Sequence, residues 1–100
     1  MSVIVEISIF PTDKGPSVSP YVARAFDIIK QSGLPHQLTS MGTCIEGEWS
    51  AVMAVVDACF KELASDCARI YLSLKVDYRK GRTEGLHNKI ASVKAKSSST

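Results

Sequence analysis

The amino-acid sequence predicts an α+β domain in which four antiparallel strands form one sheet and two helices cover one of its faces. Three observations carry this prediction. Four segments alternate apolar and polar residues as strands do, two longer segments repeat apolar residues at helical spacing, and their order along the chain is strand, helix, strand, strand, helix, strand. A right-handed crossover in each strand–helix–strand half turns this order into a ferredoxin-like βαββαβ sandwich.

The first half of the chain supplies one strand, one helix and their connection. Residues 2–10 alternate as a strand with one fully apolar face and one mixed face. Ser19 followed by Pro20 predicts a helix start, because serine can cap the first turn and proline needs no donor at the first position. The helix is expected to run to about Ser32, since Gly33 is a common residue at a helix end.

The second half supplies a hairpin, a helix and the last strand. Residues 36–40 and 43–48 are separated by a two-residue turn, so we expect them to pair as an antiparallel hairpin. Residues 50–64 repeat apolar side chains at helical spacing, and residues 68–78 alternate again as the fourth strand. Further apolar residues at helical spacing predict a short third helix, capped by Thr83.

Length and composition are those of one globular domain. The chain has 100 residues, of which 45% are hydrophobic and 22% charged. We expect residues 1–95 to form a single domain and residues 96–100 to be a disordered tail. The net charge of +2 is too small to indicate a polyanionic partner by itself.

The charges are unevenly distributed. Residues 1–65 hold four Lys and Arg against seven Asp and Glu, whereas residues 66–100 hold eight against three. A basic C-terminal third can serve nucleic acid or acidic ligands, and it can equally dock one subunit on the acidic body of another.

No basic-plus-apolar leader precedes the first strand, and no apolar run approaches the roughly eighteen residues that span a bilayer, so we expect a cytoplasmic protein without membrane contact. Cys44, Cys59 and Cys67 are odd in number and lack the spacing of a metal motif. We therefore expect reduced, mostly buried thiols, without a disulfide and without a bound metal.

Residues 40–49 bring together the least common residue types of the chain. Gly42 lets the backbone turn, and the strand that follows projects Glu46 and Glu48 from one side. Trp49, the only tryptophan, comes next. Each residue also has a structural explanation, such as Trp49 as a core anchor, but the concentration makes this stretch the candidate functional site.

Three regions give the sequence a resemblance to a known family. They are Ser8-Ile9-Phe10-Pro11 with Ser17-Val18-Ser19-Pro20-Tyr21-Val22-Ala23, Met41-Gly42-Thr43-Cys44-Ile45-Glu46-Gly47-Glu48-Trp49, and Lys75-Val76-Asp77-Tyr78-Arg79-Lys80. Over nearly its whole length the chain resembles the small thiamine-binding proteins related to YkoF. The resemblance implies a ferredoxin-like fold, tetramers built as dimers of sheet-mediated dimers, and binding of thiamine or its hydroxymethylpyrimidine moiety without catalysis.

Such a ligand sets chemical requirements for its site. An aminopyrimidine needs an acceptor for its amino group, a partner for its ring nitrogens and a flat apolar surface, while the thiazolium cation favours a carboxylate or an aromatic face. The residues expected to meet these needs are Ser8, Ser19, Met41, Thr43, Glu46 and Tyr78. Catalytic residues, a metal and a cofactor are not expected.

Other functions are compatible with the same fold. A regulatory or assembly domain without a small ligand predicts the same elements, and the sequence does not separate it from a ligand carrier. An RNA-binding module would carry aromatic residues on its third strand, which here has none and has two carboxylates instead. An enzyme would need an acid–base pair or a nucleophile with a partner, and His36 and His87 lie outside any recognisable motif.

Overall fold

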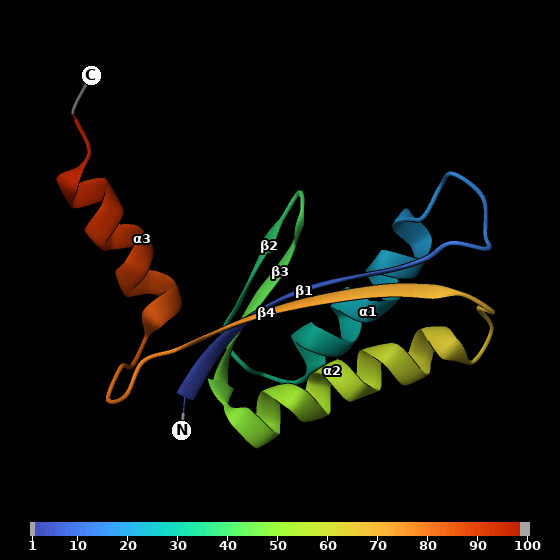
Figure 1. The fold of residues 1–100 in the computed structure, drawn as a ribbon, viewed down its shortest axis with the longest axis horizontal. Coiled ribbons are helices and arrows are strands. Elements are labelled where there is room, and N and C mark those ends of the chain that lie inside the picture. Colours follow the sequence, from blue (N-terminus) through green and yellow to red (C-terminus); the bar gives the residue numbers. More distant parts are fainter. Residues whose placement is uncertain (1, 99–100) are drawn as a thin grey trace.

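The structure, a computed structural model, describes residues 2–98 and confirms the predicted ferredoxin-like arrangement (Figure 1). The elements are β1 (Ser2–Pro11), α1 (Ser19–Gln31), β2 (His36–Thr39), β3 (Gly42–Glu48), α2 (Trp49–Ala64), β4 (Ile70–Tyr78) and α3 (Gly85–Lys96). The four strands form one antiparallel sheet in the order β2-β3-β1-β4. Helices α1 and α2 lie side by side on one face, and α3 lies apart from this two-layer body (Figure 1).

Strand β1 is central in the sheet, but its two neighbours accompany it over different lengths. Its pairing with β4 continues to the pair Pro11↔Ile70. Its pairing with β3 ends earlier, at Ile7↔Thr43. The β2–β3 hairpin therefore stops partway along β1, and the last residues of β1 have no strand on that side.

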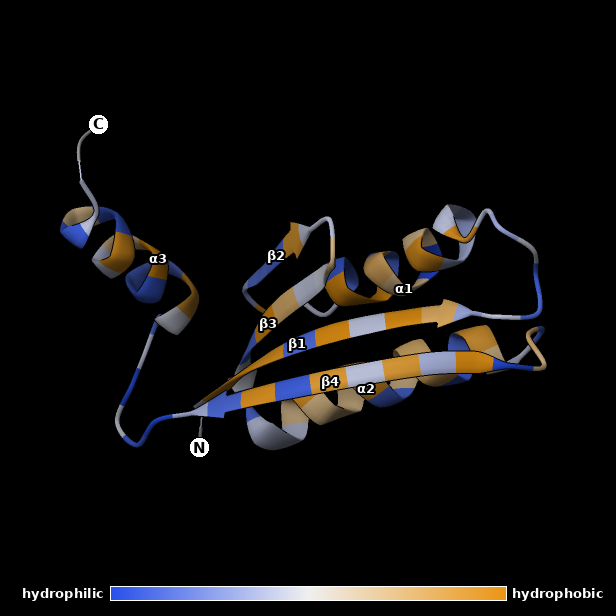
Figure 2. Cartoon of the chain, turned by 45° about the horizontal axis from the view of Figure 1, so that its top comes forward, coloured by the Kyte–Doolittle hydropathy of each residue, from blue (hydrophilic) through white to orange (hydrophobic). Residues whose placement is uncertain are grey.

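The face of the sheet under α1 and α2 forms the hydrophobic core. The apolar stripes predicted from the sequence meet there, and apolar positions alternate with polar ones along β1 and β4 (Figure 2). The core consists of Val3, Val5, Ile7, Ile9, Ala25, Ile29, Ile45, Val52, Val55, Val56, Cys59, Leu63 and Cys67. Burying a valine, leucine or isoleucine side chain stabilises a fold by about 1.5–3 kcal/mol before chain entropy is set against it, so these residues provide the main driving force for folding.

The opposite, open face of the sheet is mixed, as the alternation predicted. Glu6 on β1 forms an ion pair with Lys75 on β4, with 3.2 Å between the charged atoms. Phe10 stacks on Tyr71, with ring centroids 5.7 Å apart. Tyr71 is nevertheless 60% exposed, because α3 reaches only the other end of this face (Figure 1).

Some details of the helix starts differ from the prediction. Ser19 is not the cap of α1: the N-cap is Val18, whose carbonyl accepts the first backbone bonds of the helix. Thr83 does not cap α3, which begins at Gly85. Trp49 is 46% exposed and is no core anchor, because it starts α2 at the end of the sheet, beyond the layer of packed side chains.

The C-terminal boundary also differs, since α3 extends through Lys96, the first residue of the predicted tail. Residues 99–100 of that tail lie outside the described part of the chain. Within residues 2–98, no helix combines the length and the apolar character that crossing a membrane requires.

Cys59 provides a test of the core. It is 0% exposed, its thiol donates to the Ala25 carbonyl at 3.5 Å, and burial raises its pKa to about 11. We expect Cys59→Ala to lower the free energy of unfolding in urea by about 1 kcal/mol or somewhat more, through lost packing. Cys44→Ala, at a half-buried position on the open face, is the control and should cost less. Equal costs would contradict this description of the core.

Candidate functional site

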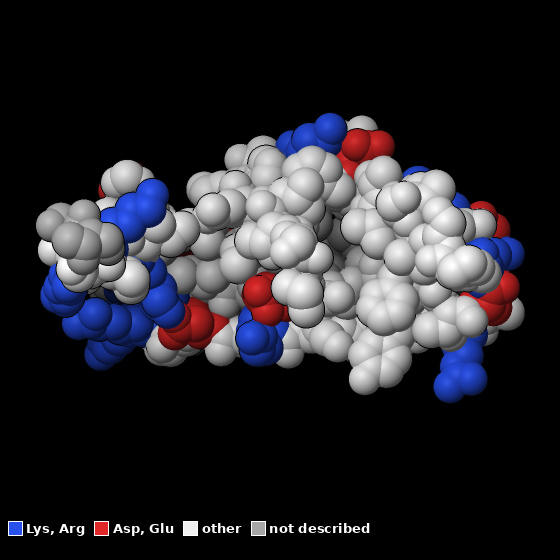
Figure 3. Space-filling model, turned by 90° about the horizontal axis from the view of Figure 1, so that it is seen from above, with Lys and Arg blue, Asp and Glu red and all other residues white. Residues whose placement is uncertain are grey.

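A cavity of about 290 Å³ opens where the β2–β3 hairpin ends beside β1 and α1. We call it the hairpin cavity. Its wall is mostly apolar, with Ile9, Val22 and Phe26 among the lining residues, and all its polar side chains are hydroxyls. Seen from above, the hollow lies among uncharged side chains (Figure 3). It is therefore suited to a ligand that is largely apolar and hydrogen-bonds at a few points.

The turn of the hairpin is fixed by Gly42 and Thr39. A Cβ on Gly42 would lie 2.7 Å from the carbonyl oxygen of Ile7, and the residue has a φ of 156°, so glycine alone fits there without strain. The Thr39 hydroxyl donates to the Gly42 carbonyl at 2.9 Å and accepts from the Met41 N–H at 3.2 Å. These contacts hold Met41, which is 79% exposed, at the mouth of the cavity.

Beside the cavity, β1 has a free strand edge. The N–H of Thr12 donates to the Arg69 carbonyl, so peptide groups of even-numbered β1 residues point toward β4 and those of odd-numbered residues point toward β3. Because pairing with β3 ends at Ile7, the N–H and C=O of Ile9 have no strand partner among the described residues. They present a donor and an acceptor side by side toward the cavity.

Two hydroxyl groups add to this polar edge. Thr43 is 5% exposed, and no described residue hydrogen-bonds its hydroxyl. Within residues 2–98, every fully buried side-chain oxygen or nitrogen has a partner, so the Thr43 hydroxyl is not fully buried. The hydroxyl must therefore open onto the cavity that Thr43 lines. Ser8 also lines the cavity and likewise has no hydrogen-bond partner in the described chain. The Thr43 hydroxyl is available to a ligand on the helix-bearing side of the sheet, whereas Ser8, which alternates with Ile7 and Ile9, borders the cavity from the open face.

The structure brings together only part of the predicted site. Three predicted residues line the hairpin cavity: Ser8, Met41 and Thr43. Ser19 is exposed and lies next in sequence to Val18, which lines the cavity. Tyr78 lies elsewhere, because it pairs with Val3 at the opposite end of β1.

Glu46 does not share the cavity with Thr43, because the two side chains lie on opposite faces of the sheet. Its carboxylate accepts hydrogen bonds from the N–H of Gly85 at 2.6 Å and from the N–H of Leu86 at 3.3 Å. Glu46 is 5% exposed. It therefore satisfies the first free amides of α3, where a negative charge is also favourable, and it ties this helix to β3.

Sequence reasoning missed the contributions of α1 and of the β1 backbone. Val22 and Phe26 are apolar residues at helical spacing, a pattern that predicts a core stripe, but both line the cavity. Their spacing indicated that they lie on one side of the helix. Nothing in that spacing indicates that the hairpin above them ends early and leaves Ile9 unpaired.

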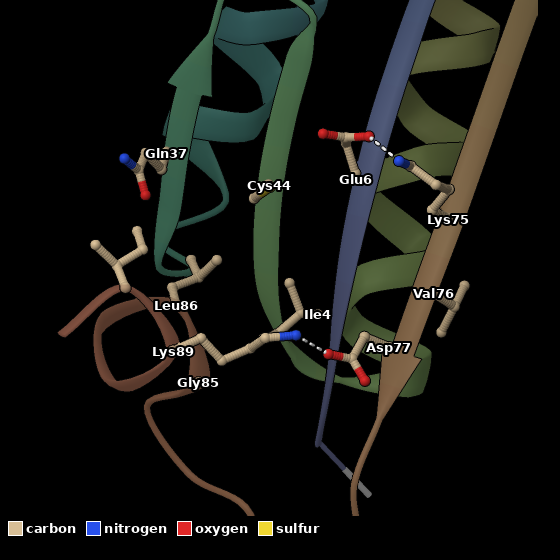
Figure 4. Close-up of a pocket in the computed structure, with 11 residues that line it drawn as sticks. Ile4, Glu6, Gln37, Cys44, Lys75, Val76, Asp77, Gly85, Leu86 and Lys89 are labelled. Atoms are coloured by element: carbon tan, nitrogen blue, oxygen red, sulfur yellow. Dashed lines mark hydrogen bonds and ion pairs between the residues drawn. The ribbon is translucent and has the colours of Figure 1, made fainter. Parts of the chain in front are cut away.

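A second hollow, of about 470 Å³, lies between α3 and the open face of the sheet (Figure 4). Its carboxylates are already engaged: Glu6 pairs with Lys75, and Asp77 pairs with Lys89. The hydrogen bond from Lys89, together with one from Arg82, holds the pKa of Asp77 below its ordinary value. The two carboxylates and two ammonium groups that line this hollow offset each other, so no unpaired carboxylate among the lining residues is left for a cationic ligand.

The chain is thus a small α+β domain with a mostly apolar, hydroxyl-bearing cavity beside its hairpin. A model of the thiamine-binding protein family matches residues 5–94. The chain belongs to this family, as the resemblance in its sequence predicted.

Relatives and solved structures agree with this assignment. The chain is 39% identical over 94 residues to UPF0045 protein Mb1933 of Mycobacterium bovis, covering 93% of this chain and 92% of that protein. The crystal structure of hypothetical protein MJ1052 of Methanocaldococcus jannaschii matches with a TM-score of 0.87 at 31% identity, covering 93% of this chain and 96% of that one. A Thermotoga maritima protein proposed to act in thiamine biosynthesis or salvage matches with a TM-score of 0.80 at 25% identity, over 92% and 98% of the two chains.

The role of Glu46 can be tested with Glu46→Gln. The amide removes the charge and leaves one helix amide without its acceptor, so we expect a loss of about 1–3 kcal/mol in local stability. Hydrogen exchange should accelerate at the amides of Gly85 and Leu86. Glu62→Gln, which removes an exposed ion pair with Arg24, is the matched control and should cost less than about 1 kcal/mol. If Glu46→Gln leaves hydrogen exchange at these amides unchanged and weakens ligand binding, Glu46 is a ligand-binding residue and does not hold α3.

Proposed function

We propose that this protein binds thiamine or its hydroxymethylpyrimidine moiety reversibly in the hairpin cavity and does not turn it over. The observation that carries the proposal is the meeting of the unpaired Ile9 edge with the free hydroxyl of Thr43 in an otherwise mostly apolar cavity. Membership in the thiamine-binding family supports this choice of ligand.

The aminopyrimidine ring complements these groups. Its amino group is a donor and the adjacent ring nitrogen is an acceptor, which matches the carbonyl and the N–H of Ile9 in one plane. Val22 and Phe26 supply apolar surface for the ring. A volume of about 290 Å³ is near the lower end of the range for small-molecule sites, so it suits one small ring better than a large cofactor.

The thiazolium half would lie at the mouth of the cavity, next to Met41. No charged side chain of residues 2–98 lines the cavity, so the cation gains no ion pair inside it. At the exposed mouth the cation keeps much of its hydration and avoids the large cost of burying an unpaired charge. Affinity would then come mainly from the pyrimidine half.

Three segments that carry the family resemblance surround this cavity. Residues 8–11, residues 17–23 and the start of residues 41–49 come from β1, α1 and the hairpin, and each contributes lining side chains. Residues 75–77, from a further segment that carries the resemblance, line the hollow beneath α3 instead, so the larger share of the resemblance supports the hairpin cavity.

The polar groups of the cavity also support binding without turnover. They are hydroxyls and peptide groups, and the described lining residues include no histidine, cysteine, carboxylate or amine. A serine or threonine hydroxyl without a neighbouring base is a poor nucleophile at neutral pH. Proton transfer and covalent catalysis therefore have no side chain to carry them.

Calorimetry with hydroxymethylpyrimidine and thiamine tests the proposal. We expect saturable binding of both, with affinity lowered about 2- to 12-fold in Thr43→Val, the effect of losing one neutral hydrogen bond. The melting temperature of the empty protein should not fall, because the hydroxyl has no partner in the described chain. Thr83→Val, at the other end of the molecule, is the matched control. If neither compound gives a binding heat at millimolar concentration, the proposal is wrong, and the alternative that remains is a regulatory or assembly domain without a small ligand.

We also infer that the protein self-associates, with β4 at one of its interfaces. As an edge strand of nine residues, β4 has no partner on its outer side among the described residues. On its helix-bearing side Leu72, Val76 and Tyr78 are 36%, 46% and 48% exposed. A long apolar strand edge promotes uncontrolled pairing unless something covers it. A second copy would cover it, and the open face around Tyr71 offers the further surface that a dimer of dimers requires.

Two pairs of substitutions separate these surfaces. Leu72→Lys with Val76→Lys alters the β4 edge, and Tyr71→Glu with Lys75→Glu alters the open face. Each pair should lower the oligomer by one step, from tetramer to dimer, because charge is buried at only one of two interfaces. Size exclusion coupled to light scattering would measure the mass of the oligomer, with Lys61→Glu, at an exposed position on α2, as the control. A monomer for the unmodified protein at micromolar concentration would refute the inference.

A further inference from the structure

We propose that the loop between β4 and α3, together with the exposed side of α3, binds a phosphate-bearing small molecule. A hollow of about 580 Å³ lies there, and we call it the basic hollow. It includes Arg79, Lys80, Thr83, Asn88 and Ser92. This site is separate from the hairpin cavity, because α3 lies apart from the two-layer body that contains the hairpin (Figure 1) and the two hollows share no lining residue.

The charge of this segment is strongly positive. Between residues 79 and 96 there are six Lys and Arg against one carboxylate, Glu84. Lys and Arg side chains gather at the α3 end of the molecule, on the left in Figure 3. This concentration of positive charge attracts anions locally, although the net charge of +2 gives the whole molecule little attraction for them.

The cations divide into a structural and a free set. Arg82 donates to the Asp77 carboxylate at 3.0 Å and to the Asp77 carbonyl at 2.8 Å, and Lys89 bonds to the same carboxylate. Arg79 and Lys80 have no ion pair or hydrogen bond through their side chains within residues 2–98. Asp77 therefore engages the two inner cations and offsets one of their two charges, while the two outer cations remain available to a ligand.

The loop that carries the free cations is held in place. The N–H of Arg82 donates to the Arg79 carbonyl at 3.1 Å and closes a turn. The side chain of Arg82 is only 12% exposed because it is anchored on Asp77. The Asn88 amide donates to the Thr83 carbonyl at 3.3 Å and joins the end of the loop to α3. Arg79 and Lys80 thus extend from an ordered backbone, which lowers the entropy cost of gathering them around an anion.

Neutral donors complete the hollow. Asn88 and Ser92 are four residues apart on α3 and therefore lie on one side of the helix. Lys96 donates to the Ser92 hydroxyl at 3.1 Å, which adds a third ammonium or guanidinium group beside the hollow. A phosphate group offers several acceptor oxygens, and it bonds most strongly to charged donors such as Arg and Lys. Arg79, Lys80 and the Ser92 hydroxyl supply donors of these kinds.

The extent of the basic hollow favours a small anion over a nucleic acid. Binding to a phosphate backbone needs a row of cations that follows many phosphates. Here the carboxylates of Asp77 and Glu84 flank the basic residues, and the nearby open face carries Glu6. Glu84 adds a repulsive charge, and Asp77 and Glu6 offset the charge of the cations they pair with, so the surface past the hollow attracts a longer chain of phosphates only weakly.

Calorimetry with inorganic pyrophosphate at low ionic strength tests the proposal. The unmodified protein should bind pyrophosphate saturably, and Arg79→Gln with Lys80→Gln should weaken binding about tenfold or more. Lys30→Gln with Lys61→Gln removes the same charge from the helices of the main body and should change binding less than about twofold, the effect of net charge alone. Thiamine binding should be equal in all three proteins, so this test does not depend on the proposed thiamine site.

Three outcomes would overturn the proposal. One is no saturable heat with pyrophosphate, and another is an equal loss in both double variants, which would mean nonspecific attraction. The third is tighter binding of a single-stranded oligonucleotide than of pyrophosphate, with a steep dependence on salt, which would assign the surface to nucleic acid.

Discussion

The early end of the β2–β3 hairpin beside β1 is the constraint on which the candidate site depends. Gly42 allows the hairpin to turn within contact of the Ile7 carbonyl, where any side chain would collide with it. Because the hairpin stops there, the sheet is incomplete around Ile9, while α1 still covers the same region. A cavity with an apolar wall and a peptide edge follows directly from this geometry, without any charged side chain.

A second glycine allows close packing at the start of α3. A Cβ on Gly85 would lie 2.7 Å from the Ile4 side chain and 3.0 Å from the Glu46 carboxylate, so any larger residue there would push these side chains aside. The buried carboxylate of Glu46 then holds the helix start, and Asp77 holds the preceding loop through Arg82. These contacts keep the basic C-terminal segment ordered and separate from the uncharged hairpin cavity.

Much of the fold was predictable because it is encoded locally. The alternation from Val3 to Ile9 and the stripe on residues 50–64 each specify an element and its buried face, and the turn at Gly42 specifies the hairpin. The site was predictable only in part, because its key features are not local. The partnership of Glu46 with Gly85 spans 39 residues. The exposure of the Ile9 peptide depends on where β3 starts relative to β1. The alternation of apolar and polar residues does not determine that starting point.

The proposed function depends on recognition of the pyrimidine ring by the unpaired edge of β1. Amide NMR of ¹⁵N-labelled protein during titration with hydroxymethylpyrimidine would detect this contact. We expect the largest, saturable shifts at the amides of Ile9 and Thr43, and no shift at the amides that line the hollow between α3 and the open face of the sheet. Largest shifts at Cys44 and Lys89, with the Ile9 amide unchanged, would contradict it.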